Sequence, residues 1–371
     1  MKSLGYKKST ADPCLYYKWD TMHGLLVWIS WCDDLVLFGS NKEVVLREVT
    51  KVKRLFEIDD AGPLVDYLGC RLEIDWEKKS CHITQPVLIQ SLKDEYNPSD
   101  TAVPLPANPR TVLRKADKDD GVNRKRQKEY RAKVGRILHM AAWSRPDITN
   151  ATREVSRHGQ HATIRHHRAL DHLITYLWHT AKRGWLLQPT RTWTGSDQSF
   201  QFHISGKSDS DYATCKDTRK SVSGYVVYLE DAPITVKSVM QKIIALSVTE
   251  AELIALVQCI QEMIFAKKVV ESMGLLVKTQ MIVYCDNKGA VDLINGHSVG
   301  GNTKHIDVRI LHMRDLKEKE VVLVKWISTD ENESDVNTKN TGSKVYNKHI
   351  QRFVGHDEYI AEARRLLDQM V

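Results

Sequence analysis

Four carboxylates in the second half of the chain have the settings that metal-dependent cleavage of a phosphodiester requires. Asp209 ends one expected strand, Asp286 directly follows another, Asp335 follows a third, and Glu252 opens an expected amphipathic helix. Strand ends and a helix start can bring acids from distant parts of a chain to one point. Two divalent ions about 4 Å apart need such a set, to hold the attacking and leaving oxygens of the phosphodiester. Mg²⁺ prefers carboxylate oxygen and water as ligands, which suits an all-acid site.

Each of these acids taken singly is also typical of an ordinary protein surface. Glu250 lies two residues before Glu252, and either would interact favourably with the positive end of the helix dipole without any chemistry. The pattern alone therefore leaves both interpretations open for each residue.

A second acidic motif lies near the N-terminus. Asp33 and Asp34 separate two apolar, β-prone runs, 25–31 and 35–38, which predicts a hairpin with the acids at its tip. Aspartates are common in turns for purely conformational reasons. A polymerase palm uses such a pair to hold metal at the primer end, and the pattern does not choose between the two interpretations.

The elements that must position the four acids alternate between strands and helices after residue 200. Apolar runs predict strands over 223–229, 234–237, 281–285 and 321–327, and periods of three to four residues predict helices over 252–273 and 305–319. This alternation predicts a mixed sheet with helices packed on it. Residues 130–179 show the helical period as well.

Composition limits the classes of protein to which the chain belongs. With 371 residues and 42% hydrophobic content, the chain can bury two cores, so two or three domains are expected. No apolar run approaches the roughly 20 residues that span a bilayer, and the first residues lack the apolar stretch of a signal peptide. The seven cysteines are scattered, which argues against a zinc module and favours a reducing compartment.

Positive charge is concentrated between Arg110 and Arg136, where eleven Lys or Arg face four Asp or Glu, an excess equal to the whole-chain charge of +7. Residues 114–128 are polar and without period, which predicts a flexible linker. Such a linker can contact a phosphate backbone or can simply be solvated, and charge alone does not decide.

The motifs resemble those of one family in their order and spacing. The chain is similar to the reverse transcriptase and ribonuclease H parts of copia-type retrotransposon Pol polyproteins from about Gly5 to Lys348. The motifs that carry this resemblance are the following: 5–14, 66–74, 208–213, 217–225, 245–252, 303–307 and 330–339.

The resemblance implies a ribonuclease H site. Asp209, Glu252, Asp286 and Asp335 take the metal-binding positions of the family, and Glu252 is preferred to Glu250 because Ala-Glu-Leu-Ile-Ala-Leu matches the family wording. The implied cofactor is Mg²⁺ or Mn²⁺, two ions at one site, and the implied activity is hydrolysis of RNA in RNA–DNA hybrids. The implied substrate contacts are Lys220, Lys237, Lys304 and His305.

The resemblance also makes Asp33 and Asp34 the paired aspartates of a polymerase site. Trp31-Cys32 precede them, where the family usually has Tyr-Val. The family has a third metal-binding aspartate on an earlier strand, upstream of the motif that starts at Gly5. We therefore expect the polypeptide as given to lack the fingers and the first palm strands and to be unable to polymerise DNA, whether or not Met1 is the true start.

The predicted fold is α/β (α+β), a truncated reverse-transcriptase palm and helical thumb or connection followed by an RNase H-like mixed sheet with flanking helices. The expected divisions are 1–105 partial palm, 106–129 basic linker, 130–200 helical thumb or connection, 201–350 RNase H-like domain and 351–371 helical tail. The family implies template-primer and hybrid nucleic acid as partners, with other Pol or Gag products. It also implies a cytoplasmic virus-like particle and later nuclear delivery.

Two other functions compete with this prediction. One is a catalytically inactive transposon relic or a module that only binds nucleic acid. The other is an integrase-like or resolvase-like nuclease on the same kind of sheet, which the reverse-transcriptase motifs upstream disfavour. Metal-dependent hybrid cleavage separates an enzyme from a binder, and a preference for hybrid over duplex DNA separates the ribonuclease from a recombinase.

Overall fold

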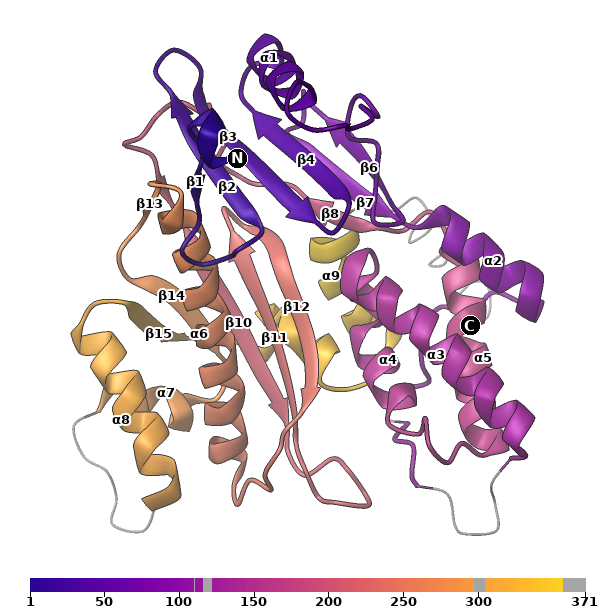
Figure 1. Ribbon diagram of the computed structural model, residues 1–371. Helices are drawn as coiled ribbons and strands as arrows, with labels where there is room; N and C mark the ends of the chain where they lie inside the picture. Colours follow the sequence, from indigo (N-terminus) through magenta and orange to yellow (C-terminus); the bar gives the residue numbers. More distant parts are fainter. Residues whose placement is uncertain (110, 116–121, 297–303, 356–371) are drawn as a thin grey trace.

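The computed structural model describes residues 1–109, 111–115, 122–296 and 304–355, with 304–307 described by backbone alone. Figure 1 shows an N-terminal sheet above a larger mixed sheet, with a group of helices beside the latter. Within the described residues, no helix combines the length and the apolar character that crossing a membrane requires.

The N-terminal part forms an antiparallel sheet of neighbouring strands. Its elements are β1 (Lys7–Lys8), β2 (Leu15–Asp20), β3 (Gly24–Trp31), β4 (Asp34–Gly39) and the helix α1 (Lys42–Lys53). Leu26 and Trp28 of β3 pack with Val44 and Val52 of α1. Trp31 pairs with Asp34, so β3 and β4 form the predicted hairpin with the acidic pair at its tip.

A second antiparallel sheet joins segments that are far apart in the chain. It consists of β5 (Asp66–Tyr67), β6 (Cys70–Asp75), β7 (Ser80–Thr84) and β8 (Trp185–Leu187), and α2 (Pro86–Tyr96) follows β7. Residues 185–187 were expected to be helical, but they form a strand. The reason is their pairing with β7, about a hundred residues earlier in the sequence.

The helical part packs around one apolar core. Its elements are α3 (Arg124–Trp143), the 3-10 helix η2 (Pro146–Ile148), α4 (Thr149–Ser156) and α5 (Ile164–His179). The prediction that 114–128 is entirely linker was wrong, because α3 begins at Arg124. The side chain of Asn123 caps that helix by accepting the backbone N–H of Arg126 at 3.0 Å. The first turns are basic and exposed, and the buried apolar residues begin only at Tyr130, which hid the helical period.

The larger sheet is mixed, as predicted, in the order β12-β11-β10-β14-β15. The three strands from β10 to β12 are antiparallel, and β10, β14 and β15 are parallel. The strands are β10 (Ile204–Asp211), β11 (Val222–Leu229), β12 (Ala232–Met240), β14 (Met281–Cys285) and β15 (Val322–Trp326). A separate parallel pair joins β9 (Gln201–Phe202) to β13 (Leu276–Val277).

Helices cover this sheet from both sides. The long helix α6 (Val248–Ser272) packs on one face, where Gly206 of β10 lies against Cys259 and Met263. The other face carries the 3-10 helix η4 (Glu333–Asn337), against which Gly224 of β11 lies. The remaining helices are α7 (Lys288–Asn295), α8 (Lys304–Glu318) and α9 (Ser343–Val354). The last of these reaches into the expected 351–371 tail, of which 356–371 lie outside the described residues.

The N-terminal sheet docks on the end of α6. The indole Nε1 of Trp19 donates to the carbonyl of Met273 at 2.9 Å, and the hydroxyls of Ser9 and Ser272 lie 2.7 Å apart. Leu25 of β3 belongs to the same apolar core as the mixed sheet. The two sheets therefore share a core.

Candidate active site: an acid cluster at one edge of the mixed sheet

Asp209 lies near the end of β10, the central strand of the mixed sheet. It pairs with Gly224 of β11, which pairs in turn with Ser238 of β12. Paired residues in adjacent strands project to the same face, and this is the face that carries η4. Asp209 is 4% exposed, and its Oδ2 accepts a hydrogen bond from the hydroxyl of Thr338.

Glu252, which the family resemblance favours, and Glu250, two residues before it, have different partners. Glu252 is buried at the start of α6, and its Oε1 accepts the backbone N–H of Ser210 in β10 at 3.2 Å. Glu250 instead accepts the backbone N–H of Leu246 at 2.7 Å, while Ser247 caps the helix by accepting the N–H of Glu250. Glu250 therefore serves the helix start, and Glu252 faces the strand that carries Asp209.

Asp286 directly follows β14, which runs parallel to β10. Its Oδ2 accepts the hydroxyl of Thr329 at 2.7 Å, and its backbone carbonyl accepts the indole N–H of Trp326 at 2.9 Å. The cap of the helix that follows, α7, is not Asp286 but Asn287, whose Oδ1 accepts the N–H of Ala290 at 2.9 Å. The Asp286 carboxylate is therefore not used as the cap.

Asp335 is held in η4 by contacts to the central strands. The fully buried side chain of Asn332 donates to the carbonyl of Ser208 in β10 at 2.9 Å and accepts from the hydroxyl of Ser334 at 2.8 Å. A Cβ on Gly224 would lie 2.8 Å from the carbonyl oxygen of Ser334. Only a residue without a side chain allows η4 to approach β11 this closely.

The four residues form one electrostatic unit, which we call the acid cluster (Asp209, Glu252, Asp286 and Asp335). Burial raises the pKa of Asp209 to about 7, with further increases from the charges of Asp335 and Asp286, against which the Thr338 hydrogen bond acts only in part. Burial, followed by the charges of Asp209 and Asp286, also raises the pKa of Glu252 well above its usual range. Mutual repulsion of this kind requires that the carboxylates lie close together.

The donor set of the acid cluster fits divalent cations that prefer oxygen. Several buried carboxylates share one region, and the ammonium group of Lys339 forms an ion pair with one of them, 2.5 Å from Oδ1 of Asp335. Bringing in positive charge would relieve the mutual repulsion of these carboxylates, which adds to the effect of burial on the pKa of Asp209. Mg²⁺ and Mn²⁺ take carboxylate oxygens as ligands, so the residues present suit either ion.

Asp33 and Asp34 do not join the acid cluster. Both are exposed at the tip of the β3–β4 hairpin, and Cys32 before them has a positive φ of 49°. Across the described part of the chain, the one set of at least three potential ligand side chains with metal-binding spacing is Glu252, Cys285 and Asp286, and the hairpin pair belongs to none.

The predicted substrate contacts are spread over the molecule. Lys237 is exposed on β12 and pairs with Tyr225, one position away from the Asp209–Gly224–Ser238 row. Because neighbouring residues of a strand point to opposite faces, its side chain projects away from the face of Asp209. Lys220 is half-buried just before β11, and the side chains of Lys304 and His305 lie outside the described residues.

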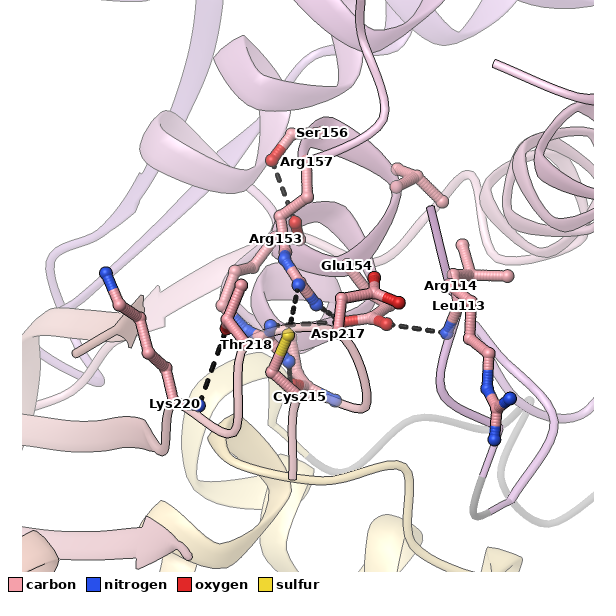
Figure 2. A network of polar contacts seen from close by, with 12 residues as sticks. Leu113, Arg114, Arg153, Glu154, Ser156, Arg157, Cys215, Asp217, Thr218 and Lys220 are labelled. Atoms are coloured by element: carbon pink, nitrogen blue, oxygen red, sulfur yellow. Dashed lines mark hydrogen bonds and ion pairs between the residues drawn. The ribbon is translucent and has the colours of Figure 1, made fainter. Parts of the chain in front are cut away.

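A polar network joins α4 to the turn that follows β10. Figure 2 shows Arg157 facing the thiol of Cys215, and its Nη2 lies 2.7 Å from Sγ. Glu154 accepts from Nη1 of Arg157 at 3.3 Å and from the backbone N–H of Leu113 at 2.7 Å. The helical part is thus hydrogen-bonded to the turn that follows the strand carrying Asp209.

Three residues of the site were not singled out from the sequence. Asn332, Thr338 and Lys339 lie within a motif that carries the family resemblance, and their polar side chains flank Asp335 closely. That proximity was the available signal. Their partners Ser208 and Asp209 are more than a hundred residues away, so the sequence alone did not show these contacts.

Comparison with known proteins identifies the family. The chain is 31% identical over 350 residues to the retrovirus-related Pol polyprotein from transposon TNT 1-94 of Nicotiana tabacum, covering 91% of this chain and 25% of that protein. It is 26% identical over 339 residues to the Pol polyprotein from transposon RE1 of Arabidopsis thaliana, covering 91% and 22%. The chain thus spans about a quarter of the length of these relatives. No family profile matches.

Among solved structures, LC11-RNase H1 in complex with an RNA/DNA hybrid is similar at 18% identity and a TM-score of 0.30, covering 38% of this chain and 97% of that one. A foamy viral protease-reverse transcriptase in complex with double-stranded DNA is similar at 12% identity and a TM-score of 0.47, covering 81% and 46%. The predicted family is confirmed by the sequence relatives. Over 91% of its length, this chain is homologous to the copia-type retrotransposon Pol polyproteins.

Proposed function

We propose that this chain hydrolyses the RNA strand of RNA–DNA hybrids and that the reaction depends on Mg²⁺ or Mn²⁺. The observation that carries the proposal is the acid cluster, in which carboxylates from β10, α6, the end of β14 and η4 converge. Burial, followed by the charges of Asp335 and Asp286, raises the pKa of Asp209 there to about 7. A protein gains no stability from such repulsion, which supports a role in binding cations.

Asp209, Glu252, Asp286 and Asp335 would hold two metal ions. When bound, such ions lower the pKa of a water molecule and stabilise charge on the phosphodiester oxygens. The chain's own contribution is to fix the ligands. Thr338 orients Asp209, and Thr329 orients Asp286. Groups that orient metal ligands typically change activity by about 10- to 100-fold when they are removed.

Hybrid recognition would use backbone geometry and 2′-hydroxyl groups, so weak sequence preference is expected. Lys220, Lys237, Lys304 and His305 remain predicted contacts to the substrate. The position of Lys237, on the face of the sheet opposite to Asp209, makes it the weakest of the four as a contact near the scissile phosphate.

We further propose that the chain as it stands does not polymerise DNA on a template-primer. Asp33 and Asp34 are exposed on a hairpin, and within the described residues no third metal-binding side chain completes a site with them. A primer-extension assay tests this, and template-dependent synthesis by the isolated chain would refute it.

The test of the nuclease is cleavage of a labelled RNA–DNA hybrid in Mg²⁺ by the full chain, by Asp286→Asn and by Asp292→Asn. Asp292 is exposed on α7, six residues away, and serves as the matched control. We expect cleavage by the wild type and the control, and loss of cleavage in Asp286→Asn. Equal cleavage by all three chains would reject the assigned site.

Two further measurements, hybrid binding and cleavage of duplex DNA, separate the rival functions. A folded chain that binds the hybrid in a gel-shift assay without cutting it would support the inactive, nucleic-acid-binding alternative. Preferential cleavage of duplex DNA would support the recombinase-like alternative instead.

A further inference from the structure

A thiol lies directly beside the acid cluster, and the nuclease reaction does not use it. Cys285 is the last residue of β14 and is fully buried. Its Sγ lies 3.7 Å from Oε2 of Glu252. One ligand atom from each of Glu252, Cys285 and Asp286 lies within 4.8 Å of the other two. Three residues thus converge with the spacing of a metal site, and one donor is sulfur.

The mixed donor set selects a different class of cation from the one that the carboxylates select. Mg²⁺ takes oxygen ligands, whereas a thiolate favours softer divalent ions. In tetrahedral zinc sites the Zn–S bond is about 2.3 Å and the Zn–O bond about 2.0–2.2 Å, which places the sulfur and oxygen atoms about 3.6 Å apart. The observed separation between Cys285 and Glu252 is 3.7 Å, so little movement is needed to share one ion.

We propose that Glu252, Cys285 and Asp286 form a binding site for one thiophilic divalent cation, Zn²⁺ or Cd²⁺. On binding, the S–H bond of Cys285 breaks, its proton passes to the solvent, and a metal–sulfur bond forms. The carboxylates of Glu252 and Asp286 supply two oxygen ligands. Water completes the shell on the side of Asp286, which is the least buried of the three.

The proposed site shares Glu252 and Asp286 with the acid cluster. If the proposed nuclease function holds, Zn²⁺ or Cd²⁺ at this site competes with the ions that support cleavage, because it takes up Glu252 and Asp286, which those ions also need. The binding of the soft ion itself does not depend on any nuclease activity.

Burial of Cys285 as a small apolar residue is the competing explanation, and Cys259 provides the comparison. Cys259 on α6 is equally buried, but its Sγ lies 3.8 Å from two backbone carbonyls, those of Lys207 and Val226. It belongs to no group of potential ligands among the described residues. Cys259 therefore serves as a buried thiol without the cluster of ligand groups that surrounds Cys285.

The experiment is a titration of the full chain with Cd²⁺. Binding is monitored by the ultraviolet charge-transfer absorption of the thiolate–cadmium bond. Three chains are compared: wild type, Cys285→Ser and Cys259→Ser. Cysteines elsewhere, such as the exposed Cys32, add a background that all three share. We expect Cys285→Ser to lose part of the band and Cys259→Ser to retain it. Full absorption in a folded Cys285→Ser chain would overturn the proposal.

A second pair of variants retains the thiol and keeps the proposal testable even if Cys285→Ser does not fold. Glu252→Gln and Asp286→Asn retain Cys285 but lose one oxygen ligand each. They should weaken Cd²⁺ binding to that thiol by at least about tenfold, whereas unchanged affinity in both would overturn the proposal. Because the signal is absorption, a chain that cuts no hybrid can still give either result.

Discussion

The hydroxyl of Thr338 donates a hydrogen bond to Oδ2 of Asp209, a residue 129 positions earlier in the chain. The same hydroxyl lies 3.0 Å from the carbonyl of Asp335. The Thr338 side chain therefore contacts both Asp209 of β10 and the 3-10 helix η4, which supplies Asp335. The acid cluster is held by such contacts and not by attraction among its members, which repel one another.

This repulsion predicts how stability changes with pH. The pKa of Asp209 rises from 3.8 to about 7, because of burial and then the charges of Asp335 and Asp286. Between about pH 4 and pH 7 the folded chain holds a proton that the unfolded chain has released, so the contribution of Asp209 to the free energy of unfolding falls as pH rises. We expect Mg²⁺ to raise the melting temperature more above pH 7 than near pH 5.

Asp209→Asn is the control for that measurement, since its amide cannot ionise. The variant should be less sensitive to pH in this window and should gain less from Mg²⁺. If wild type and variant show the same pH dependence and the same Mg²⁺ effect in thermal scans, Asp209 does not have the assigned environment.

Gly224 is predicted to control the position of η4. A Cβ there would lie 2.6 Å from Cγ2 of Thr338 and 2.8 Å from the carbonyl oxygen of Ser334. Gly224→Ala should therefore destabilise the chain by about 1–3 kcal/mol, as overpacking does, and should reduce hybrid cleavage by displacing Asp335. Urea denaturation and the cleavage assay measure the two effects.

The matched control for Gly224→Ala is Gly135→Ala in α3, where an added Cβ would meet nothing within 4 Å. Alanine in a helix interior is favoured over glycine by about 0.5–1 kcal/mol, so this variant should be slightly more stable. Equal effects of the two substitutions would contradict the role given to Gly224.

A buried ion pair is predicted to be needed for the docking of α9. Arg145 and Asp147 lie 2.8 Å apart with side chains 0% exposed, and the hydroxyl of Tyr346 in α9 donates to the carbonyl of Asp147 at 2.9 Å. Asp147→Asn leaves a buried guanidinium without its counter-charge. The expected loss in free energy of unfolding is about 3–5 kcal/mol.

For comparison, Asp315 of α8 pairs with Lys319, just beyond the end of that helix, at 2.8 Å, but the Asp315 side chain is 50% exposed. Asp315→Asn should cost less than about 1 kcal/mol. The difference between the two variants in urea denaturation measures the effect of burial, and a similar small cost for both would show that the Arg145 pair is dispensable.

The thiol of Cys215 is predicted to ionise more readily than an ordinary cysteine. Burial alone would raise its pKa, but hydrogen bonds from the Thr218 side chain and from the backbone of Thr218 and Asp217, together with the Arg157 charge, lower it. Arg157→Met should raise the pKa again. The measurement is the pH titration of thiolate absorbance, taken as the difference between chains with Cys215 and with Cys215→Ser.

The lowered pKa of Cys215 also determines how this thiol changes the free energy of unfolding with pH. Because the pKa is lower in the folded chain than in the unfolded one, the thiolate adds to the free energy of unfolding above the unfolded pKa, and this contribution is lost as pH falls through the folded value. Arg157→Met should reduce that increase at alkaline pH. If the substitution leaves the Cys215 titration unchanged, the hydrogen bond from Arg157 to Cys215 shown in Figure 2 does not govern the thiol.

Local patterns predicted much of the fold. The hairpin around Asp33, the strand before Asp286 and the helix that carries Glu252 each lie where apolar periodicity placed them. The start of α3 was missed because its first turns are basic and exposed, so no apolar period marks Arg124. The pairing of Trp185–Leu187 with β7 depends on residues a hundred positions away, and no local pattern encodes it.

The acids of the site were named from the sequence, but the means of holding them were not. The contact of Asn332 with Ser208 and the close approach at Gly224 arise only when η4 packs on the sheet. Capping by Asn287 rather than Asp286 likewise depends on backbone geometry at the end of β14. Periodicity identifies which residues are present, whereas these contacts depend on tertiary packing.

The docking of the N-terminal sheet on α6 has a consequence for the shorter fragments that one would cut from this chain. Removing residues before Ile204 would expose to water the apolar surface that Leu25 and Trp19 now cover, and would leave the carbonyl of Met273 without its indole donor. A fragment trimmed in this way would be prone to aggregate. The N-terminal strands thus shield the core of the mixed sheet from solvent, a role that depends on no catalytic activity of their own.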